Sequence, residues 1–330
     1  MSAAKPARPK PSISSLRQAL ADLVDDDARL AQLGRRLVAA VAVLAIAFTA
    51  FYVYDRYYTT VESPLEQAVH ELENKVRQQP NDVELRLQVA GGYFRQKRYD
   101  EAIKQYTEAL KLRENWQPAL LGIASSELAR GNEAKTEEIY RTIVELNKDN
   151  EMKYANRDLG VVFYRLGAFA EKKKNYAEAA DWAKEALKID RGDADSLFLL
   201  AKSEETLGNK EVAREAYRLA TDFDPNFREG FAGLSRMASA LGDQREASYA
   251  HGMEQLAAGD ADAALATFRQ LVQQAPDFAE AHQGLGLALG KKGQREEAER
   301  AFRAALERKP SLLLAQWSLP SAQPAGAPAK

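Results

Sequence analysis

The chain has 330 residues, of which 45% are hydrophobic and 28% are charged, and its formal net charge is −2. This balance indicates a folded protein, and the near-neutral charge provides no basic field that would favour a nucleic-acid partner. The absence of cysteine excludes disulfides, thiolate metal sites and cysteine nucleophiles.

Residues 1–34 are predicted to form a tail that leads into a membrane segment. Residues 5–11 are rich in proline and basic side chains, which is typical of a solvated linker that can also touch anionic headgroups. Further along, Ser14 or Ser15 can cap a short helix whose apolar residues fall on one stripe. We therefore expect a short amphipathic helix in this tail, lying at an interface or against a partner.

Residues 35–58 are predicted to cross a membrane as one helix. Eighteen consecutive residues, 37–54, carry no charge, and a helix of that length spans about 27 Å, close to a hydrocarbon core of ~30 Å. Arg36 and Arg56 flank this stretch, and tyrosines near its end provide an aromatic girdle. A cleavable signal peptide is disfavoured because the charged region before the stretch is too long. A buried helix of a soluble domain is disfavoured because no neighbouring segment would cover all of its faces.

Basic residues are more frequent before this segment than after it. Those within about twenty positions are Arg17, Arg29, Arg35 and Arg36 on the N-terminal side, and Arg56 and Lys75 on the other. Because lysine and arginine favour the cytoplasmic side of a span, the N-terminus is predicted to be cytoplasmic and the rest of the chain extracytoplasmic.

From residue 63 onward, a helical pattern recurs at a fixed spacing. A small residue holds the same place in successive units, mostly 34 residues apart, and a large apolar residue usually stands four places later. Glycine marks the turn inside several units, and proline ends several of them. The small residues are Ala68, Ala102, Thr136, Ala179, Ala213, Ala264 and Ala298, and the later places hold Leu72, Tyr106, Tyr140, Ala183, Tyr217, Phe268 and Phe302.

A unit of this length, with these small, aromatic and proline places, resembles the tetratricopeptide repeat family. The resemblance covers nearly all of residues 63–312 and implies an all-α fold, a right-handed solenoid of helix-turn-helix pairs. The expected segments are a half unit at 63–82, full units at 83–116, 117–150, 160–193, 194–227, 245–278 and 279–312, an extra helix at 228–244, and a capping segment with a flexible tail at 313–330.

Two departures from the regular spacing are informative. Residues 151–159 form an insertion between two full units, and residues 228–244 supply a helix without a complete partner of its own. Either the helix at 245–258 is shared by two hairpins, or the array breaks near Gly242.

No pattern for catalysis or cofactor binding stands out. His70 and Glu71 begin like the zinc-protease pattern, but Asn74 occupies the place of the second histidine ligand. His251 and His282 lie in different repeats without a supporting acidic pair. The glycines at 284–290 fall inside a repeat helix, where close packing explains them better than a nucleotide loop. We expect no enzyme activity, metal site or cofactor.

In this family the first helix of each pair lines a concave groove, so the resemblance implies a peptide-binding or helix-binding surface there. The groove places hold an apolar and aromatic set, although each member can instead pack helix against helix. A clamp for a C-terminal carboxylate is not expected, because its places carry leucine, glycine and serine. The groove residues are Leu87, Phe94, Leu121, Leu128, Tyr164, Phe198, Tyr249, Met253 and Leu256.

The sequence is also similar to bacterial membrane-anchored members of this family. That resemblance implies a single-pass protein of the inner membrane whose repeats lie in the periplasm and bind another protein. The protein would act as a scaffold or as a chaperone-like assembly factor. The alternative is a stable structural subunit of a membrane protein complex. The expected partner is a protein or peptide, itself membrane-associated or translocated.

Overall fold

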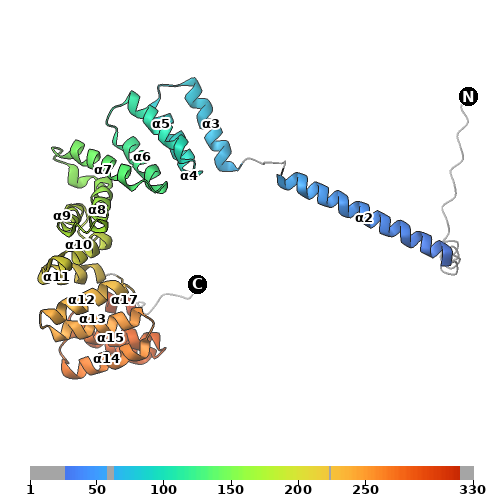
Figure 1. Cartoon of the computed structure of the whole chain (residues 1–330). Coiled ribbons are helices and arrows are strands. Elements are labelled where there is room, and N and C mark those ends of the chain that lie inside the picture. The colour runs from blue at the N-terminus through green and yellow to red at the C-terminus, as the bar shows by residue number, and fades with distance from the viewer. Residues whose placement is uncertain (1–26, 58–62, 223, 320–330) are drawn as a thin grey trace, which may run out of the picture. The chain divides into compact units, whose positions relative to one another are not determined.

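The computed structural model describes residues 27–57, 63–222 and 224–319 (Figure 1). Within these ranges it contains helices and no strand, so the predicted all-α class is confirmed. The chain divides into two compact units, Met1–Glu71 and Leu72–Lys330. The predicted short helix before residue 27 and the tail beyond residue 319 lie outside the described residues.

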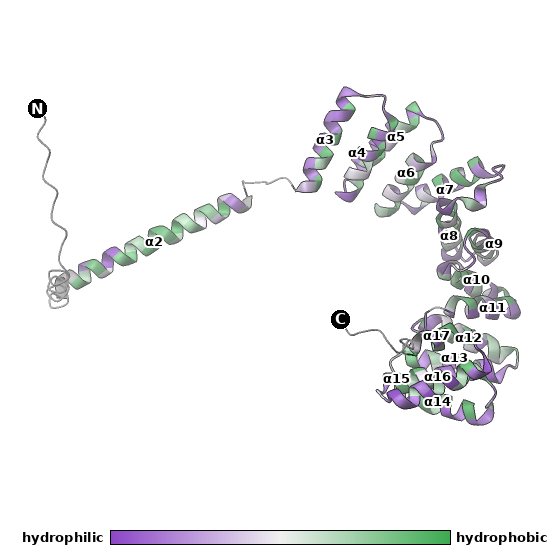
Figure 2. Ribbon diagram, turned by 180° about the vertical axis from the view of Figure 1, so that it is seen from behind, coloured by the Kyte–Doolittle hydropathy of each residue, from purple (hydrophilic) through white to green (hydrophobic). Residues whose placement is uncertain are grey.

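The first unit is dominated by α2, a helix of 31 residues over Asp27–Tyr57. It begins earlier than the predicted membrane segment, because residues 28–33 include alanine, leucine and arginine, which are strong helix formers. Apolar residues run along most of its length (Figure 2). Of the helices in the described ranges, only this one contains a segment, Leu30–Asp55, long and apolar enough to span a membrane, and none of that segment's apolar window is buried.

After α3 (Pro64–Gln78), which crosses the boundary between the units, the second unit consists of successive antiparallel helices (Figure 1). Most are roughly three to four turns long, which matches the repeat pattern, and the two shortest have three and six residues. They are α4 (Val83–Arg95), α5 (Tyr99–Leu112), α6 (Gln117–Ala129), α7 (Glu133–Asn147), η1 (Lys153–Ala155), α8 (Arg157–Lys172), α9 (Tyr176–Ile189), α10 (Ala194–Leu207), α11 (Lys210–Thr221), α12 (Arg228–Ala240), α13 (Gln244–Ala257), α14 (Ala261–Gln274), α15 (Ala279–Lys291), α16 (Arg295–Arg308) and α17 (Leu313–Ser318).

The turn inside each helix pair uses one residue with left-handed backbone conformation. Gly131 and Gly208 have φ of 81° and 86° at this place, where a residue without Cβ avoids a steric clash. Lys97 and Lys174, one repeat earlier in each case, adopt the same conformation with φ of 61°. The repeat therefore imposes this backbone geometry even where the sequence supplies no glycine.

Neighbouring pairs interlock by placing an aromatic ring against a helical glycine. A Cβ at Gly122 would lie 2.2 Å from Cζ of Tyr106, and one at Gly284 would lie 2.2 Å from Cε1 of Phe268. Gly233 stands in the same relation to Tyr217. In each case the glycine follows the ring by the same number of residues, so the spacing of the repeat fixes where backbone and ring approach each other.

The extra helix α12 is packed on both sides. Its Leu234 and Met237 belong to one apolar cluster with α10 and α11, and its Phe231 belongs to another with α13 to α16. Helix α13 contacts both α12 and α14. The helices therefore pack against one another on both sides of Gly242.

Candidate protein-binding surface

Most of the predicted groove residues lie on the first helices of the pairs and are half-buried. Leu87 and Leu121 hold equivalent places on α4 and α6, and Tyr164 and Phe198 hold the same place on α8 and α10. Tyr164 and Phe198 pack against one core cluster. Equivalent places on consecutive first helices are thus brought onto one side of the array, with part of each side chain left accessible.

The prediction is wrong for two residues of α13. Met253 is fully buried and Leu256 is 8% exposed, and both belong to the apolar cluster around Phe268. The cause is the shared position of α13, because a helix that packs against neighbours on two sides buries a wider stripe of its surface. These side chains stabilise the core and offer no contact area to a partner.

The aromatic groove residues are held by ring contacts. The ring of Phe94 lies 5.6 Å from that of Tyr99, and the ring of Phe198 lies 4.8 Å from that of Phe227. Lys202 places its Nζ 5.6 Å from the centre of the Phe198 ring. These contacts fix the ring orientations, so little side-chain entropy would be lost when a ligand covers the exposed edges.

The groove becomes polar in its middle, at residues that the predicted groove set did not include. Phe94 and Leu128 of the first two full units are followed at the same place by Glu171 and Glu205. Glu205 accepts two hydrogen bonds from Arg236, at 2.9 and 3.0 Å, and one from Tyr217. Burial raises the pKa of Glu205, but these donors outweigh burial and hold it below its ordinary value. The apolar character is therefore strongest on α4 and α6.

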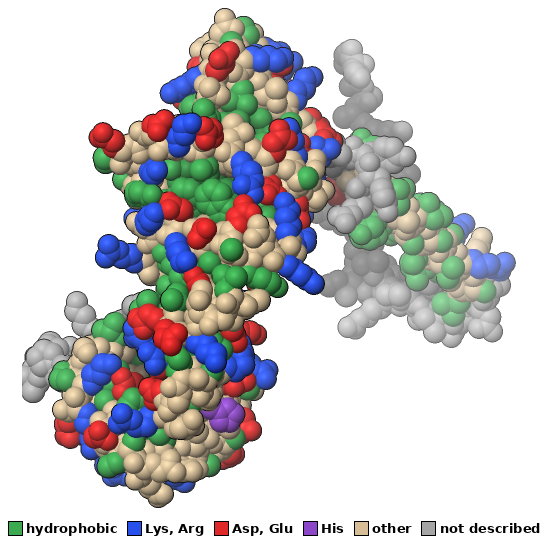
Figure 3. Space-filling model, turned by 60° about the vertical axis from the view of Figure 1, so that its left-hand side comes forward, with side chains coloured by type: hydrophobic (Ala, Val, Ile, Leu, Met, Phe, Trp, Pro, Cys, Tyr) green, Lys and Arg blue, Asp and Glu red, His purple; other side chains and the backbone are tan. Residues whose placement is uncertain are grey.

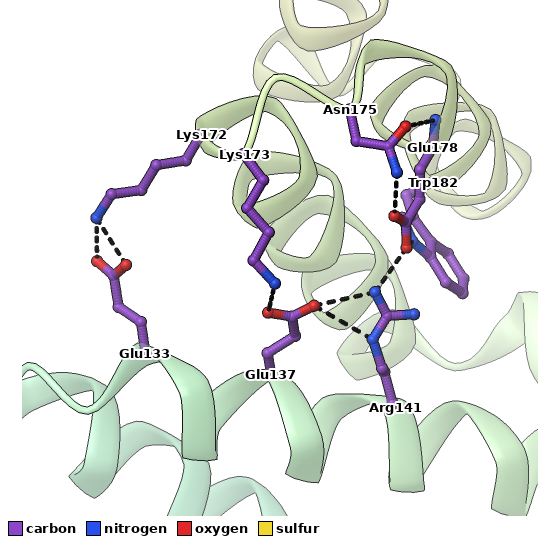
Figure 4. Close-up of polar contacts among 8 residues, drawn as sticks. All are labelled: Glu133, Glu137, Arg141, Lys172, Lys173, Asn175, Glu178 and Trp182. Carbon is purple, nitrogen blue, oxygen red and sulfur yellow. Dashed lines mark hydrogen bonds and ion pairs between the residues drawn. The ribbon is translucent and has the colours of Figure 1, made fainter.

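A dense polar network joins α7 to the α8–α9 hairpin (Figure 4). Arg141 donates to Glu137 at 3.0 Å and to Glu178 at 2.6 Å. Lys173 reaches Glu137 at 2.5 Å, and Lys172 pairs with Glu133 at 2.6 Å. On the face shown in Figure 3, charges of both signs are interspersed, so this surface presents no large patch of one sign.

The histidines show no arrangement typical of metal ligands. His282 is 8% exposed, and its Nε2 is 3.0 Å from the carbonyl oxygen of Pro276. His251 lies beside Gln255, with 3.1 Å between the side-chain nitrogens. No group of three or more histidine or acidic side chains in the described ranges could hold a metal ion.

Comparison with protein families decides what kind of array this is. Three family models, each described as tetratricopeptide repeat, match residues 64–158, residues 161–193 and 194–227, and residues 249–312. Together these matches cover well over half of the chain. The chain belongs to the tetratricopeptide repeat family.

Solved structures of tetratricopeptide repeat proteins resemble this one in fold. Part of a repeat protein from Cytophaga hutchinsonii is 13% identical, with 82% of this chain and 98% of that one covered and a TM-score of 0.43. A repeat protein from Parabacteroides merdae is 16% identical, with coverage of 81% and 95% and a TM-score of 0.43. The TPR2AB domain of yeast Sti1, solved as a complex with pHSP90, is 21% identical, with coverage of 72% and 81% and a TM-score of 0.32.

Proposed function

We propose that this tetratricopeptide repeat protein is a membrane-anchored scaffold or assembly factor that binds a segment of another protein along its first helices. The observation that carries the proposal is the apolar segment Leu30–Asp55, which precedes the repeats and is not buried. Apolar surface left in water costs about 25 cal/mol per Å². Insertion into a bilayer removes this cost, and the length of the segment suits a hydrocarbon core.

Half-buried apolar side chains support a hydrophobic peptide or amphipathic helix as the ligand. Phe94 and Leu128, at the same place on α4 and α6, leave part of their surface accessible. Leu87 and Leu121 do the same at the place two turns earlier. A ligand that covers several such anchors gains roughly 1 kcal/mol or more from each, which is sufficient for moderate affinity.

The proposed orientation places the N-terminus in the cytoplasm and the repeats outside it, in the periplasm of a bacterium. The basic bias before α2 supports this orientation. Protease added to intact spheroplasts is expected to digest the repeats and to spare the N-terminal tail. If the repeats were protected in intact spheroplasts and digested only after lysis, the orientation would be the opposite of the one proposed.

Site-specific photocrosslinking tests the binding surface. A photoreactive residue at Leu128 of the full-length membrane protein is expected to give discrete adducts with a partner protein. A control at Val212, an exposed residue of the second helix α11, should give none of these adducts. Equal adducts at both positions, or none at either, would contradict the proposal.

Purification of the full-length membrane protein in detergent distinguishes an assembly factor that binds transiently from a permanent subunit. A scaffold or assembly factor is expected to co-purify with its partner in less than equal amounts, because it releases its client. Equimolar recovery with one membrane complex after detergent extraction would instead favour the structural-subunit alternative.

A further inference from the structure

A cavity of about 590 Å³ lies in the C-terminal part of the array. Its walls come from α11, the extra helix α12, the shared helix α13, the start of α15, and the segment between α16 and α17. This volume is in the range of pockets that hold small ligands or peptide side chains. Tyr249 and Gln283, which hold equivalent groove places one repeat apart, both line it.

One wall carries a buried acceptor that lacks a donor. Gln283 is 3% exposed, and its Nε2 donates to the hydroxyl oxygen of Tyr249 at 3.3 Å. Its Oε1 accepts no hydrogen bond from any residue that the structure describes. A buried acceptor without a partner is costly, so the protein itself does not satisfy all the polar groups around this cavity.

Two carboxylates of the cavity form only long ion pairs with neighbouring arginines. Glu246, whose side chain is 18% exposed, lies 3.7 Å from Nε of Arg214, and Asp222 at the rim lies 3.9 Å from Arg218. Both separations exceed hydrogen-bond length. Burial raises the pKa of each carboxyl, and the charge of Asp243 adds to the rise at Glu246. Arg214 lowers the pKa of Glu246 and Arg218 lowers that of Asp222, but burial outweighs both. The positive charge nearby therefore compensates the two carboxylates only in part.

The basic groups of the cavity, by contrast, are mostly engaged. Arg218 donates to Glu215 at 2.9 Å, and Lys309 pairs with Glu280 at 2.7 Å. Arg308 donates to two backbone carbonyl oxygens, at 2.7 and 2.6 Å. Arg245 has a side chain that is 61% exposed and stands at the rim. An anion would find little unused positive charge inside, whereas a cation would find unused acceptors.

We propose that this cavity binds a lysine or arginine side chain presented by the partner segment. The cation would lie near Glu246 and Asp222, which both line the cavity. The Tyr249 and Phe278 rings, 6.2 Å apart, would cover the aliphatic part of the side chain. This assignment rests on the proposed function, because it names what the partner brings to the C-terminal end of the groove.

Selection from a random peptide library displayed on phage, with the full chain in detergent, tests the assignment. The selected peptides are expected to share lysine or arginine at one fixed position. Replacing that residue by norleucine in a synthetic peptide should weaken binding to the wild-type protein about tenfold or more. The same replacement should have little effect on binding to Glu246→Gln, or to Asp222→Asn if the first variant does not fold.

Asp262→Asn is the matched control, because Asp262 is an acidic residue of α14 outside the cavity and its side chain is 80% exposed. This variant should keep the full preference for the basic residue. Selected peptides without a fixed basic position, or equal norleucine effects in wild type and Glu246→Gln, would overturn the cation site and leave the peptide-binding function standing. Failure to select any peptide would count against both.

Discussion

Two glycines of the same helix, α15, have opposite roles. A Cβ at Gly284 would lie 2.2 Å from the Phe268 ring, whereas nothing lies within 4 Å of a Cβ at Gly290. Overpacking costs about 1–3 kcal/mol, and alanine gains up to about 1 kcal/mol in helix propensity over glycine. We expect Gly284→Ala to destabilise the array by roughly 1–2 kcal/mol and Gly290→Ala to stabilise it by up to about 1 kcal/mol. Urea unfolding measures both, and changes of the same sign would refute the packing argument.

Burial and ion pairing shift the pKa of the Glu204 carboxyl in opposite directions. Its side chain is 4% exposed, and it accepts from Lys184 at 2.7 Å and from the Asn209 side chain at 2.6 Å. Burial raises its pKa, but these two donors outweigh burial and hold the pKa below its ordinary value. Glu204 therefore contributes stability that is fully present above its unfolded pKa and is lost as pH falls through its folded pKa.

Removal of the Lys184 cation should reveal this dependence. Lys184→Met leaves a buried carboxylate without its cation, so we expect a loss of about 1–3 kcal/mol near neutral pH. The loss should shrink as the pH falls through the folded-state pKa of Glu204, because the carboxyl then becomes protonated in the wild-type protein as well. Urea unfolding at several pH values measures it. Lys210→Met, at an exposed position on α11, is the control, and a loss that does not change with pH would contradict the assignment.

At the scale of the helix pair, the left-handed turn residue allows a reciprocal exchange. Lys97 and Gly131 hold the same turn place in consecutive repeats, with φ of 61° and 81°. A residue with a side chain costs about 1–2 kcal/mol at such a place. Glycine avoids this cost, but its greater freedom in the unfolded chain cancels part of the gain. Lys97→Gly should stabilise the array by roughly 0.5–1 kcal/mol, and Gly131→Lys should destabilise it by a similar amount. Thermal unfolding of the two variants checks the prediction, and a loss of stability in Lys97→Gly would disprove it.

The sequence predicted the all-α fold and the family because each repeat has its own local signals. Spacing, small residues and turn glycines were sufficient for both. The turns at Lys97 and Lys174 carried no glycine, so only the repeat spacing indicated them. Met253 and Leu256 are buried in a cluster that also contains Phe231 of α12, a helix outside the regular pattern, so periodicity alone did not indicate their burial. The unmatched acceptors at Gln283 and Glu246 depend on contacts between distant repeats, which periodicity does not report.

At the scale of the whole array, the junction between α7 and α8 differs from the others. The insertion that contains η1 separates these helices, and they contact each other less extensively than the other consecutive α-helices between α4 and α16 do. Polar side chains bridge the gap. Glu137, with a side chain 13% exposed, accepts from Lys173 and Arg141, and Arg141 continues to Glu178 (Figure 4). Such ion pairs are weakened by salt to a greater extent than apolar packing.

We therefore expect the array to bend most readily at this junction when the network is weakened. The chain has no cysteine, so spin labels can be attached to introduced cysteines alone. Labels at Lys104 on α5 and Lys210 on α11 span the junction, whereas labels at Lys210 and Arg269 on α14 do not. Glu137→Gln with Glu178→Gln, or salt at about 1 M, where the Debye length is only ~3 Å, should broaden the first distance distribution and leave the second unchanged. Glu145→Gln, which removes an exposed pair within α7, should change neither, and equal broadening of both distributions would show that the flexibility is not located at α7–α8.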